Sequence, residues 1–159
     1  MDFLTTDLCD EFSDDLQVAT PMFKSYGGKS KFFGEIQTIK VFEDNSLVRD
    51  VLGENGEGKV LVVDGGGSLR CALLGDQLGE LAVKNGWQGV IIYGCMRDSV
   101  AINALDLGVR AIDTHPLKSV KKGVGDHQLP VTFAGVTFRP GEYVYVDEDG
   151  IITAQKPLF

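Results

Sequence analysis

The sequence is poor in cysteine and histidine, and the few that it contains are scattered. The cysteines Cys9, Cys71 and Cys95 form no Cys-x-x-Cys pair. A disulfide framework or a zinc cluster is therefore not expected, and reduced thiols in a cytoplasm are the simpler expectation. The two histidines, His115 and His127, are too few for a multi-histidine metal site, and neither lies in a pattern that would activate a Ser or Cys nucleophile.

Long apolar runs and a surplus of positive charge are also missing. No run approaches the ~20 apolar residues that span a bilayer, and residues 1–4 lack the basic and apolar regions of a signal peptide. The 15 basic residues against 23 acidic ones give a net charge of −8. We therefore expect no membrane and no direct nucleic-acid partner, whereas a basic protein partner is compatible with this charge.

The composition that is present suits one domain over residues 1–159, since 43% of the residues are hydrophobic and 24% are charged. Periodicity predicts an α/β fold with a mixed sheet and a β-rich second half. Short loops between strand, helix and strand favour parallel βαβ units. The predicted strands are 31–41, 59–63, 89–93, 109–112, 131–138, 143–146 and 151–153, and the predicted helices are 46–52, 77–85 and 100–105.

An N-terminal helix is predicted within residues 3–16, with Thr5 or Thr6 as its cap. Its acidic side chains should lie mostly on the outer face, which is typical of a solvated surface and would also suit a basic partner. These side chains are Asp7, Asp10, Glu11, Asp14 and Asp15.

A triple glycine follows the strand 59–63, in the run Asp64-Gly65-Gly66-Gly67-Ser68. The dinucleotide pattern Gly-x-Gly-x-x-Gly is absent, and so is the phosphate-loop pattern that ends in Gly-Lys-Ser/Thr. We therefore interpret the glycines as a tight turn that lets the backbone approach a ligand or another chain. Asp64 is either a carboxylate that supports a site or a turn former, and the sequence leaves both open.

The segment Gly75–Asp98 carries the strongest functional signal. Asp76 is a plausible N-cap for the helix 77–85, and the first turn of a helix favours an anion through its free N–H groups and its dipole. After the next strand, Arg97 could close on the same anion as a bidentate fork. Asp98 could hold a divalent metal as a hard oxygen ligand, or could simply cap the helix 100–105.

These parts would suit metal-assisted enolate chemistry, in which a cation polarises a carbonyl. A Schiff-base aldolase would instead need a buried lysine of lowered pKa. Lys84 lies on a helix surface by its pattern, and no lysine shows specific support for that role. The loop 113–125 holds the only basic cluster, Lys118, Lys121 and Lys122, and we expect it to fold over the site.

Several longer blocks make the chain resemble the RraA-like family, which is named after a regulator of ribonuclease E activity. The blocks are Asp7–Asp10, Gly27-Gly28, Phe42–Asn45, Val60–Ser68, Gly89–Gly94, Phe133–Phe138 and Pro140-Gly141. The resemblance covers nearly the whole chain. It implies a single-domain swivelling β/β/α-type fold and a ring-shaped homotrimer with sites at subunit boundaries.

Some members of this family are metal-dependent aldolases for 4-hydroxy-4-methyl-2-oxoglutarate that also decarboxylate oxaloacetate. Their mark is an Asp, twenty residues, and Arg-Asp, which Asp76 and Arg97-Asp98 match without a gap. The resemblance implies that Gly75, Asp76, Gln77 and Leu78 bind the pyruvyl end of the substrate, and that Arg97 pairs with its carboxylate or carbonyl oxygen. Asp98 would anchor Mg²⁺ or Mn²⁺, partly through waters, and cleavage would give two pyruvates through an enolate.

Other members resemble this chain closely outside that motif and inhibit ribonuclease E. The alternative function is therefore a regulatory protein that binds this nuclease without catalysis, through an acidic surface. A further family label, a menaquinone methyltransferase, finds no support in the glycine run described above.

Overall fold

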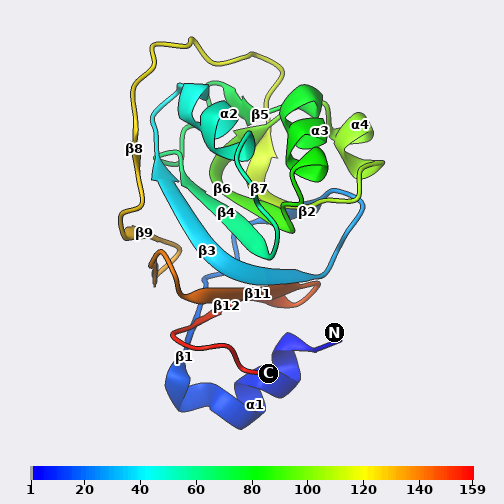
Figure 1. Cartoon of the computed structure of the whole chain (residues 1–159), viewed down its shortest axis with the longest axis vertical. Helices are drawn as coiled ribbons and strands as arrows, with labels where there is room; N and C mark the ends of the chain where they lie inside the picture. Colours follow the sequence, from blue (N-terminus) through cyan, green and yellow to red (C-terminus); the bar gives the residue numbers. More distant parts are fainter. Residues whose placement is uncertain (1) are drawn as a thin grey trace.

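The computed structural model describes residues 2–159, and its framework over this range is a ten-stranded mixed sheet (Figure 1). Along the main path the strands lie in the order β1-β12-β11-β3-β4-β6-β7-β2, with β5 paired to β6 and β8 paired to β3. The bounds are β1 Leu16–Val18, β2 Lys24–Tyr26, β3 Phe32–Lys40, β4 Lys59–Asp64, β5 Ala72–Leu74, β6 Gly89–Met96, β7 Gly108–Thr114, β8 Asp126–His127, β11 Tyr143–Asp147 and β12 Gly150–Ala154.

The centre of the sheet is parallel, because β3, β4, β6 and β7 are joined by crossovers. Helices α2 (Ser46–Leu52), α3 (Asp76–Lys84) and α4 (Ser99–Asn103) lie together on one side of it (Figure 1). Side chains alternate along each strand, so Leu61 and Val63 of β4 pack under these helices, whereas Val60 and Val62 face the other side. This explains why the strands read as continuous apolar runs: both faces are covered.

The opposite face of the sheet is covered by a separate hairpin of β9 (Val131–Phe133) and β10 (Val136–Phe138). The prediction of a single strand over 131–138 was wrong. Ala134 and Gly135 both have positive φ, 52° and 72°, which is the backbone of a two-residue hairpin turn. The other predicted strands and helices are present, α2 with its predicted ends and the others with ends shifted by a few residues.

The N-terminal helix α1 (Thr5–Phe12) forms a layer of its own below β11 and β12 (Figure 1). It is shorter than predicted, because a 3₁₀ turn, η1 (Ser13–Asp15), follows it. Thr5 does not cap the helix. Its N–H and its hydroxyl donate instead to the buried Asp147 carboxylate, at 2.7 and 2.6 Å, which ties α1 to the end of β11.

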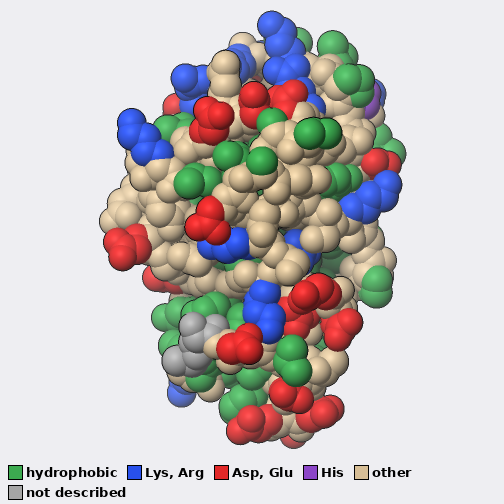
Figure 2. Space-filling view, turned by 90° about the vertical axis from the view of Figure 1, so that its right-hand side faces the viewer, with side chains coloured by type: hydrophobic (Ala, Val, Ile, Leu, Met, Phe, Trp, Pro, Cys, Tyr) green, Lys and Arg blue, Asp and Glu red, His purple; other side chains and the backbone are tan. Residues whose placement is uncertain are grey.

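The five acidic side chains predicted on the outer face of this segment are all exposed, as predicted. Figure 2 shows acidic side chains gathered over the lower end of the molecule, where α1 lies. Across residues 2–159, no helix has the length and apolar character needed to cross a membrane.

Candidate functional site

The pairing of β5 with β6 brings the two halves of the predicted site together. The strands are parallel, with Leu74 opposite Met96, and the N–H of Arg97 donates to the carbonyl of Leu74 at 2.8 Å. The residues that follow the two strands therefore emerge side by side at the same edge of the sheet. Gly75 leads into α3 on one side, and Arg97 and Asp98 leave β6 on the other.

Asp98 has a backbone conformation that decides where its carboxylate points. Its φ is +59°, in the left-handed region that few non-glycine residues adopt. Asp98 stands at the N-cap position of α4, but its side chain makes no capping bond there. Its Oδ2 accepts the N–H of Asp76 at 3.0 Å instead, so that the carboxylate lies at the start of α3. The alternative that Asp98 caps the helix that follows it was therefore wrong.

The start of α3 also differs from the prediction in its cap. The N-cap position is Gly75, and Asp76 is the first helical residue. Asp76 Oδ1 accepts the N–H of Gln77 at 2.9 Å, and the N–H of Asp76 itself donates to Asp98. Two N–H groups of this turn thus donate to carboxylate oxygens of the chain itself, which shows that the turn accommodates negative charge.

Gly75 lies where a larger residue would disturb this arrangement. A Cβ placed on it would stand 2.9 Å from Asp98 Oδ2 and 3.4 Å from Arg97 Nε. Its φ of −130° is open to any residue, so that the requirement for glycine comes from the close approach of these two side chains.

A small pocket of about 140 Å³ is formed at this edge of the sheet, and it contains every residue of the predicted site. It is below the ~300–1,000 Å³ typical of pockets for drug-sized ligands, which suits a small molecule. The lining residues are Asn45, Arg49, Ala72, Leu74, Gly75, Asp76, Gln77, Leu78, Arg97, Asp98, Lys118 and Lys121.

Part of the pocket comes from residues that the sequence did not single out. Asn45 is the N-cap residue of α2 and Arg49 lies in the middle of this helix, which packs beside α3. The expectation that the basic loop folds over the site is confirmed for Lys118 and Lys121, which line the pocket. Arg97 contacts the same loop, because its Nη1 donates to the carbonyl of Pro116 at 3.4 Å.

The loop that carries these lysines is fixed by one buried carboxylate. Asp44 is 2% exposed, and its Oδ2 accepts the N–H groups of Lys122 and Val124, at 2.8 and 3.1 Å. Its Oδ1 accepts the N–H and the hydroxyl of Ser46. Burial raises the pKa of Asp44, but the hydrogen bonds from Ser46, Val124 and Lys122 outweigh it and hold the pKa well below its usual range.

Two further bonds hold the same loop against the core. The hydroxyl of the buried Ser119 donates to Asn45 Oδ1 at 2.9 Å and accepts the Asn45 N–H at 3.1 Å. The carbonyl of Leu117 accepts the N–H of Ala72, the first residue of β5, at 2.8 Å. The backbone of the loop is therefore fixed from both α2 and β5, while the side chains of Lys118 and Lys121 are exposed.

The donors at this site fit a divalent cation that keeps most of its water. Asp98 is exposed, and a carboxylate offers about four lone-pair positions, of which the Asp76 N–H takes one. Within residues 2–159, no group of three or more His, Cys, Asp or Glu side chains is placed to hold a metal ion. Mg²⁺ is commonly held in this way, by one or two carboxylates and waters.

The triple glycine lies outside this pocket. Asp64 is 8% exposed, and its Oδ1 accepts the N–H of Gly66 at 2.9 Å, so of its two predicted roles it takes that of turn former. Gly66 and Gly67 have positive φ, and a Cβ on Gly67 would meet the ring of Tyr93 at 3.0 Å. The glycines thus serve the turn after β4.

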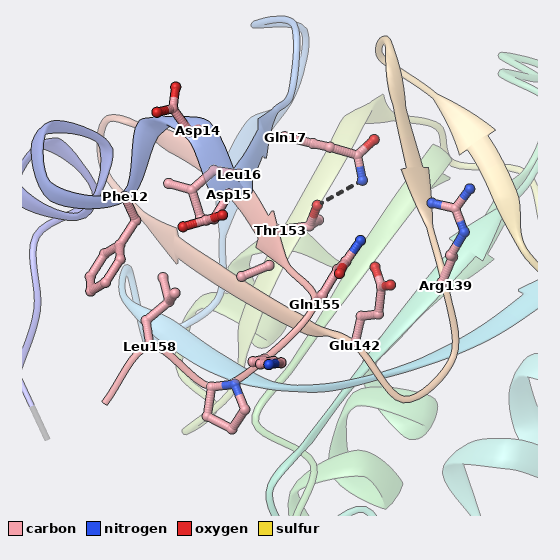
Figure 3. A pocket seen from close by; sticks show the side chains of 13 residues that line it. Phe12, Asp14, Asp15, Leu16, Gln17, Arg139, Glu142, Thr153, Gln155 and Leu158 are labelled. Atoms are coloured by element: carbon pink, nitrogen blue, oxygen red, sulfur yellow. Dashed lines mark hydrogen bonds between the residues drawn. The ribbon is translucent and has the colours of Figure 1, made fainter.

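A larger cavity, of about 610 Å³, lies at the other end of the molecule (Figure 3). It is lined by the end of α1, by η1 and by the C-terminal residues, with Asp14, Asp15 and Glu142 among its side chains. Gln17 also lines this cavity, and its Nε2 donates to Thr153 Oγ1 at 3.2 Å. It flanks the antiparallel strands β1 and β12, whereas ligands of α/β sheets collect at the carboxyl ends of parallel strands. We therefore place the candidate active site in the smaller pocket.

Comparison with known proteins gives consistent similarity but several different names. A family model described as RraA-like, Aldolase/RraA, matches residues 5–153. A protein of Laribacter hongkongensis, named "Putative 4-hydroxy-4-methyl-2-oxoglutarate aldolase", is 67% identical over 158 residues, which cover 99% of each chain. A protein of Dechloromonas aromatica with the same name is 64% identical over 162 residues and again covers 99% of each chain.

Solved structures show the same fold. A structure from Thermus thermophilis, described as the RNA-processing inhibitor RraA, has a TM-score of 0.96 and 43% identity, and covers 100% of this chain and 96% of its own. A structure from Geobacillus kaustophilus, described as an S-adenosylmethionine: 2-dimethylmenaquinone methyltransferase, has a TM-score of 0.96 and 53% identity, and covers 98% and 97%. The expected RraA-type fold is thus confirmed.

Proposed function

This chain belongs to the RraA-like (Aldolase/RraA) family, and on that premise we propose that it is a divalent-metal-dependent aldolase. It would cleave 4-hydroxy-4-methyl-2-oxoglutarate to two pyruvates, with decarboxylation of oxaloacetate as a secondary activity. The observation that carries the proposal is one pocket that joins the start of α3, Arg97 and Asp98. The aldolase name of the relatives at 67% and 64% identity supports it.

In the proposed complex, Arg97 and the first turn of α3 bind the 2-oxo acid end of the substrate. The guanidinium is a planar fork that suits a carboxylate or a carboxylate and carbonyl pair. Gly75 lets this fork and the Asp98 carboxylate approach the turn closely. The N–H groups of Asp76 and Gln77 already donate to carboxylates of the chain. The substrate would therefore be bound by the remaining N–H groups of the turn and by the helix dipole.

Asp98 would hold Mg²⁺ or Mn²⁺, whose charge near the carbonyl oxygen of the substrate would favour an enolate. In the cleavage, the C4 hydroxyl loses its proton and the bond between C3 and C4 breaks. C4 becomes the carbonyl of one pyruvate, and the electron pair of the broken bond forms the enolate of the other. Protonation of C3 then completes the second pyruvate. Oxaloacetate gives the same enolate when its C4 carboxylate leaves as carbon dioxide.

The direct test is pyruvate release from both substrates, with Mg²⁺, with a chelator, and with the variants Arg97→Ala and Asp98→Ala. We expect turnover that needs the metal and is lost in both variants. Asp106→Ala removes an exposed carboxylate outside the pocket and serves as the matched control. Turnover no higher than that of the free metal, from a folded protein, would refute the enzyme proposal.

A second candidate function is inhibition of ribonuclease E, since the Thermus thermophilis structure at 43% identity is described as an RNA-processing inhibitor. The exposed acidic side chains of α1 and η1 would bind a basic surface of the nuclease, and binding would weaken as salt rises. A nuclease assay with Arg97→Ala separates the two functions. Inhibition without turnover would assign them to different surfaces, and the absence of inhibition at low salt would rule out the second.

We further propose that the chain forms a homotrimer, which the family resemblance implies. Light scattering on the purified protein tests this, with three times the chain mass as the expected result. A monomer with full turnover would refute both the trimer and its role in the site.

A further inference from the structure

We propose that Lys118 and Lys121 bind the second carboxylate of the substrate, the one remote from the 2-oxo acid end. This assigns a specificity subsite within the pocket and rests on the proposed function for the identity of the substrate. The ligand class that follows is a 2-oxo acid with two carboxylates. Arg49 of α2 lines the same pocket and adds to the positive charge.

The charge of the pocket is the first argument. Its lining holds the four cations Arg49, Arg97, Lys118 and Lys121 and the two carboxylates of Asp76 and Asp98. The pocket is therefore formally positive by two charges, although the chain as a whole has a net charge of −8. A divalent metal on Asp98 would add to this surplus. One carboxylate on Arg97 leaves a surplus of one positive charge without the metal and of three with it, and a second carboxylate lowers these to zero and two.

The attachment of the loop is the second argument. Asp44 and Ser119 fix the backbone on either side of Lys121, and the Leu117 carbonyl fixes the residue before Lys118. The bonds that hold this surface loop in place keep Lys118 and Lys121 in the lining of the pocket, although both side chains are exposed. Figure 2 shows basic side chains near the top of the molecule, at the end where this loop runs in Figure 1.

The chemistry of lysine is the third argument. Arg97 contacts the start of α3 and Pro116, so its planar fork is positioned for the end of the substrate that reacts. Lysine is instead a point charge on a flexible stem and attracts a carboxylate without fixing its angle. Such a group suits the remote end of a ligand, where charge matters more than exact orientation.

The test measures binding of two 2-oxo acids that differ only in the remote group, 2-oxoglutarate and 2-oxopentanoate. Calorimetric titration with Mg²⁺ present should show tighter binding of 2-oxoglutarate. In the double variant Lys118→Ala/Lys121→Ala this preference should fall by about tenfold, since two exposed ion pairs are lost, and affinity for 2-oxopentanoate should stay within about threefold. The preference should also decline as salt rises.

Lys122→Ala is the matched control, because Lys122 belongs to the same loop but does not line the pocket, and only its backbone N–H bonds to Asp44. It should keep the preference for the dicarboxylate. Equal losses for both acids in the double variant, or no preference in the unaltered chain, would overturn the proposal.

Turnover separates this proposal from the proposed function. With 4-hydroxy-4-methyl-2-oxoglutarate, the double variant should lose about tenfold in kcat/KM, whereas 4-hydroxy-4-methyl-2-oxopentanoate, which carries a methyl group instead of the second carboxylate, should change by less than threefold. A lysine-dependent preference in binding without any turnover would retain the subsite and reject the aldolase. Turnover with a preference that does not depend on the lysines would retain the aldolase and reject the subsite.

Discussion

Replacing Asp44 by asparagine is expected to loosen the loop of residues 115–125 while leaving the sheet intact. The carboxylate accepts two backbone N–H groups of the loop at Oδ2 and the two donors of Ser46 at Oδ1. An amide has one oxygen, so one of these pairs would face an NH₂ group instead. The variant keeps the size of the side chain and changes only its hydrogen bonding and charge.

The magnitude follows from the bonds that are lost. A hydrogen bond to a charged group is worth about 1.5–3 kcal/mol, so two of them would cost about 3–6 kcal/mol if the loop stayed in place. The loop is a surface segment in which residues 120–128 are exposed, so it can separate and let water reach the freed N–H groups. We therefore expect a cost of about 2–3 kcal/mol, expressed mainly as local opening.

The assay is amide hydrogen exchange at Lys122 and Val124, combined with urea unfolding. Exchange at these two amides should rise by about 30- to 150-fold at neutral pH, with little change in the central strands. Asp50→Asn is the control, since Asp50 is an exposed carboxylate of α2. Unchanged exchange at Lys122 and Val124 in Asp44→Asn would refute the view that this carboxylate holds the loop.

The pH dependence of the difference between Asp44→Asn and the unaltered chain is an independent test of the same role of Asp44. The pKa of Asp44 is lowered in the folded chain, so its ionised form contributes stability above the ordinary Asp pKa of about 3.9 and loses it as the pH falls further. The difference between Asp44→Asn and the unaltered chain should therefore be full at pH 7 and shrink below about pH 4. A difference that grows in acid would contradict the assignment.

Three further predictions concern other positions. Gly75→Ala should retain the fold but lose most turnover, because the added Cβ would lie 2.9 Å from Asp98 Oδ2 and displace this carboxylate. Gly150→Ala should have no effect, because its Cβ would meet open space, and equal activity of the two variants would contradict the prediction. Asp147→Asn should destabilise the chain to urea by about 1.5–3 kcal/mol, since Asp147 holds Thr5 of α1 through two bonds. Burial raises the Asp147 pKa, but the bonds from Thr5, Asp149 and Gly150 lower it overall, so this cost should also decline below about pH 4. Arg110→Met should lower the free energy of unfolding in urea by about 1–2 kcal/mol, because the carbonyls of Ser30 and Asp147 lose a buried donor. Removal of the buried charge offsets part of this loss, and a more stable variant would show that the desolvation of the guanidinium dominates.

The sequence predicts a helix or strand correctly where the spacing of its apolar residues stays the same along the whole element. Helix α2 was predicted with its observed ends, and the strands of the parallel core were found from their apolar runs. The hairpin of β9 and β10 was missed although its sequence contains a signal. Its buried residues are Val131 and Phe133 before the turn but Val136 and Phe138 after it, and this change of phase marks the turn at residues 134–135.

The candidate site divides in the same way. Arg97-Asp98 was predictable because it follows the predicted strand 89–93, and Gly75–Leu78 because Gly75 and Asp76 mark the start of a helix. Strand β5, which precedes Gly75, was not predicted. The direction of the Asp98 carboxylate was not, since it depends on a left-handed φ and on the proximity of α3. Arg49 was missed because only the packing of α2 beside α3 brings it to the pocket, and an exposed helical arginine carries no local sign of that role.

The register between β5 and β6 has a consequence for how the site forms. The chain leaves the pocket at Gly75 and returns to it at Arg97 after one helix and one strand. Closing so short a segment costs little chain entropy, and contacts between near neighbours in sequence form faster than distant ones. The binding groups of the start of α3, Arg97 and Asp98 can thus come together before the terminal strands and α1 dock on the core. The last layers to fold would then dock at the other end of the molecule, on a core in which the binding groups are already in place.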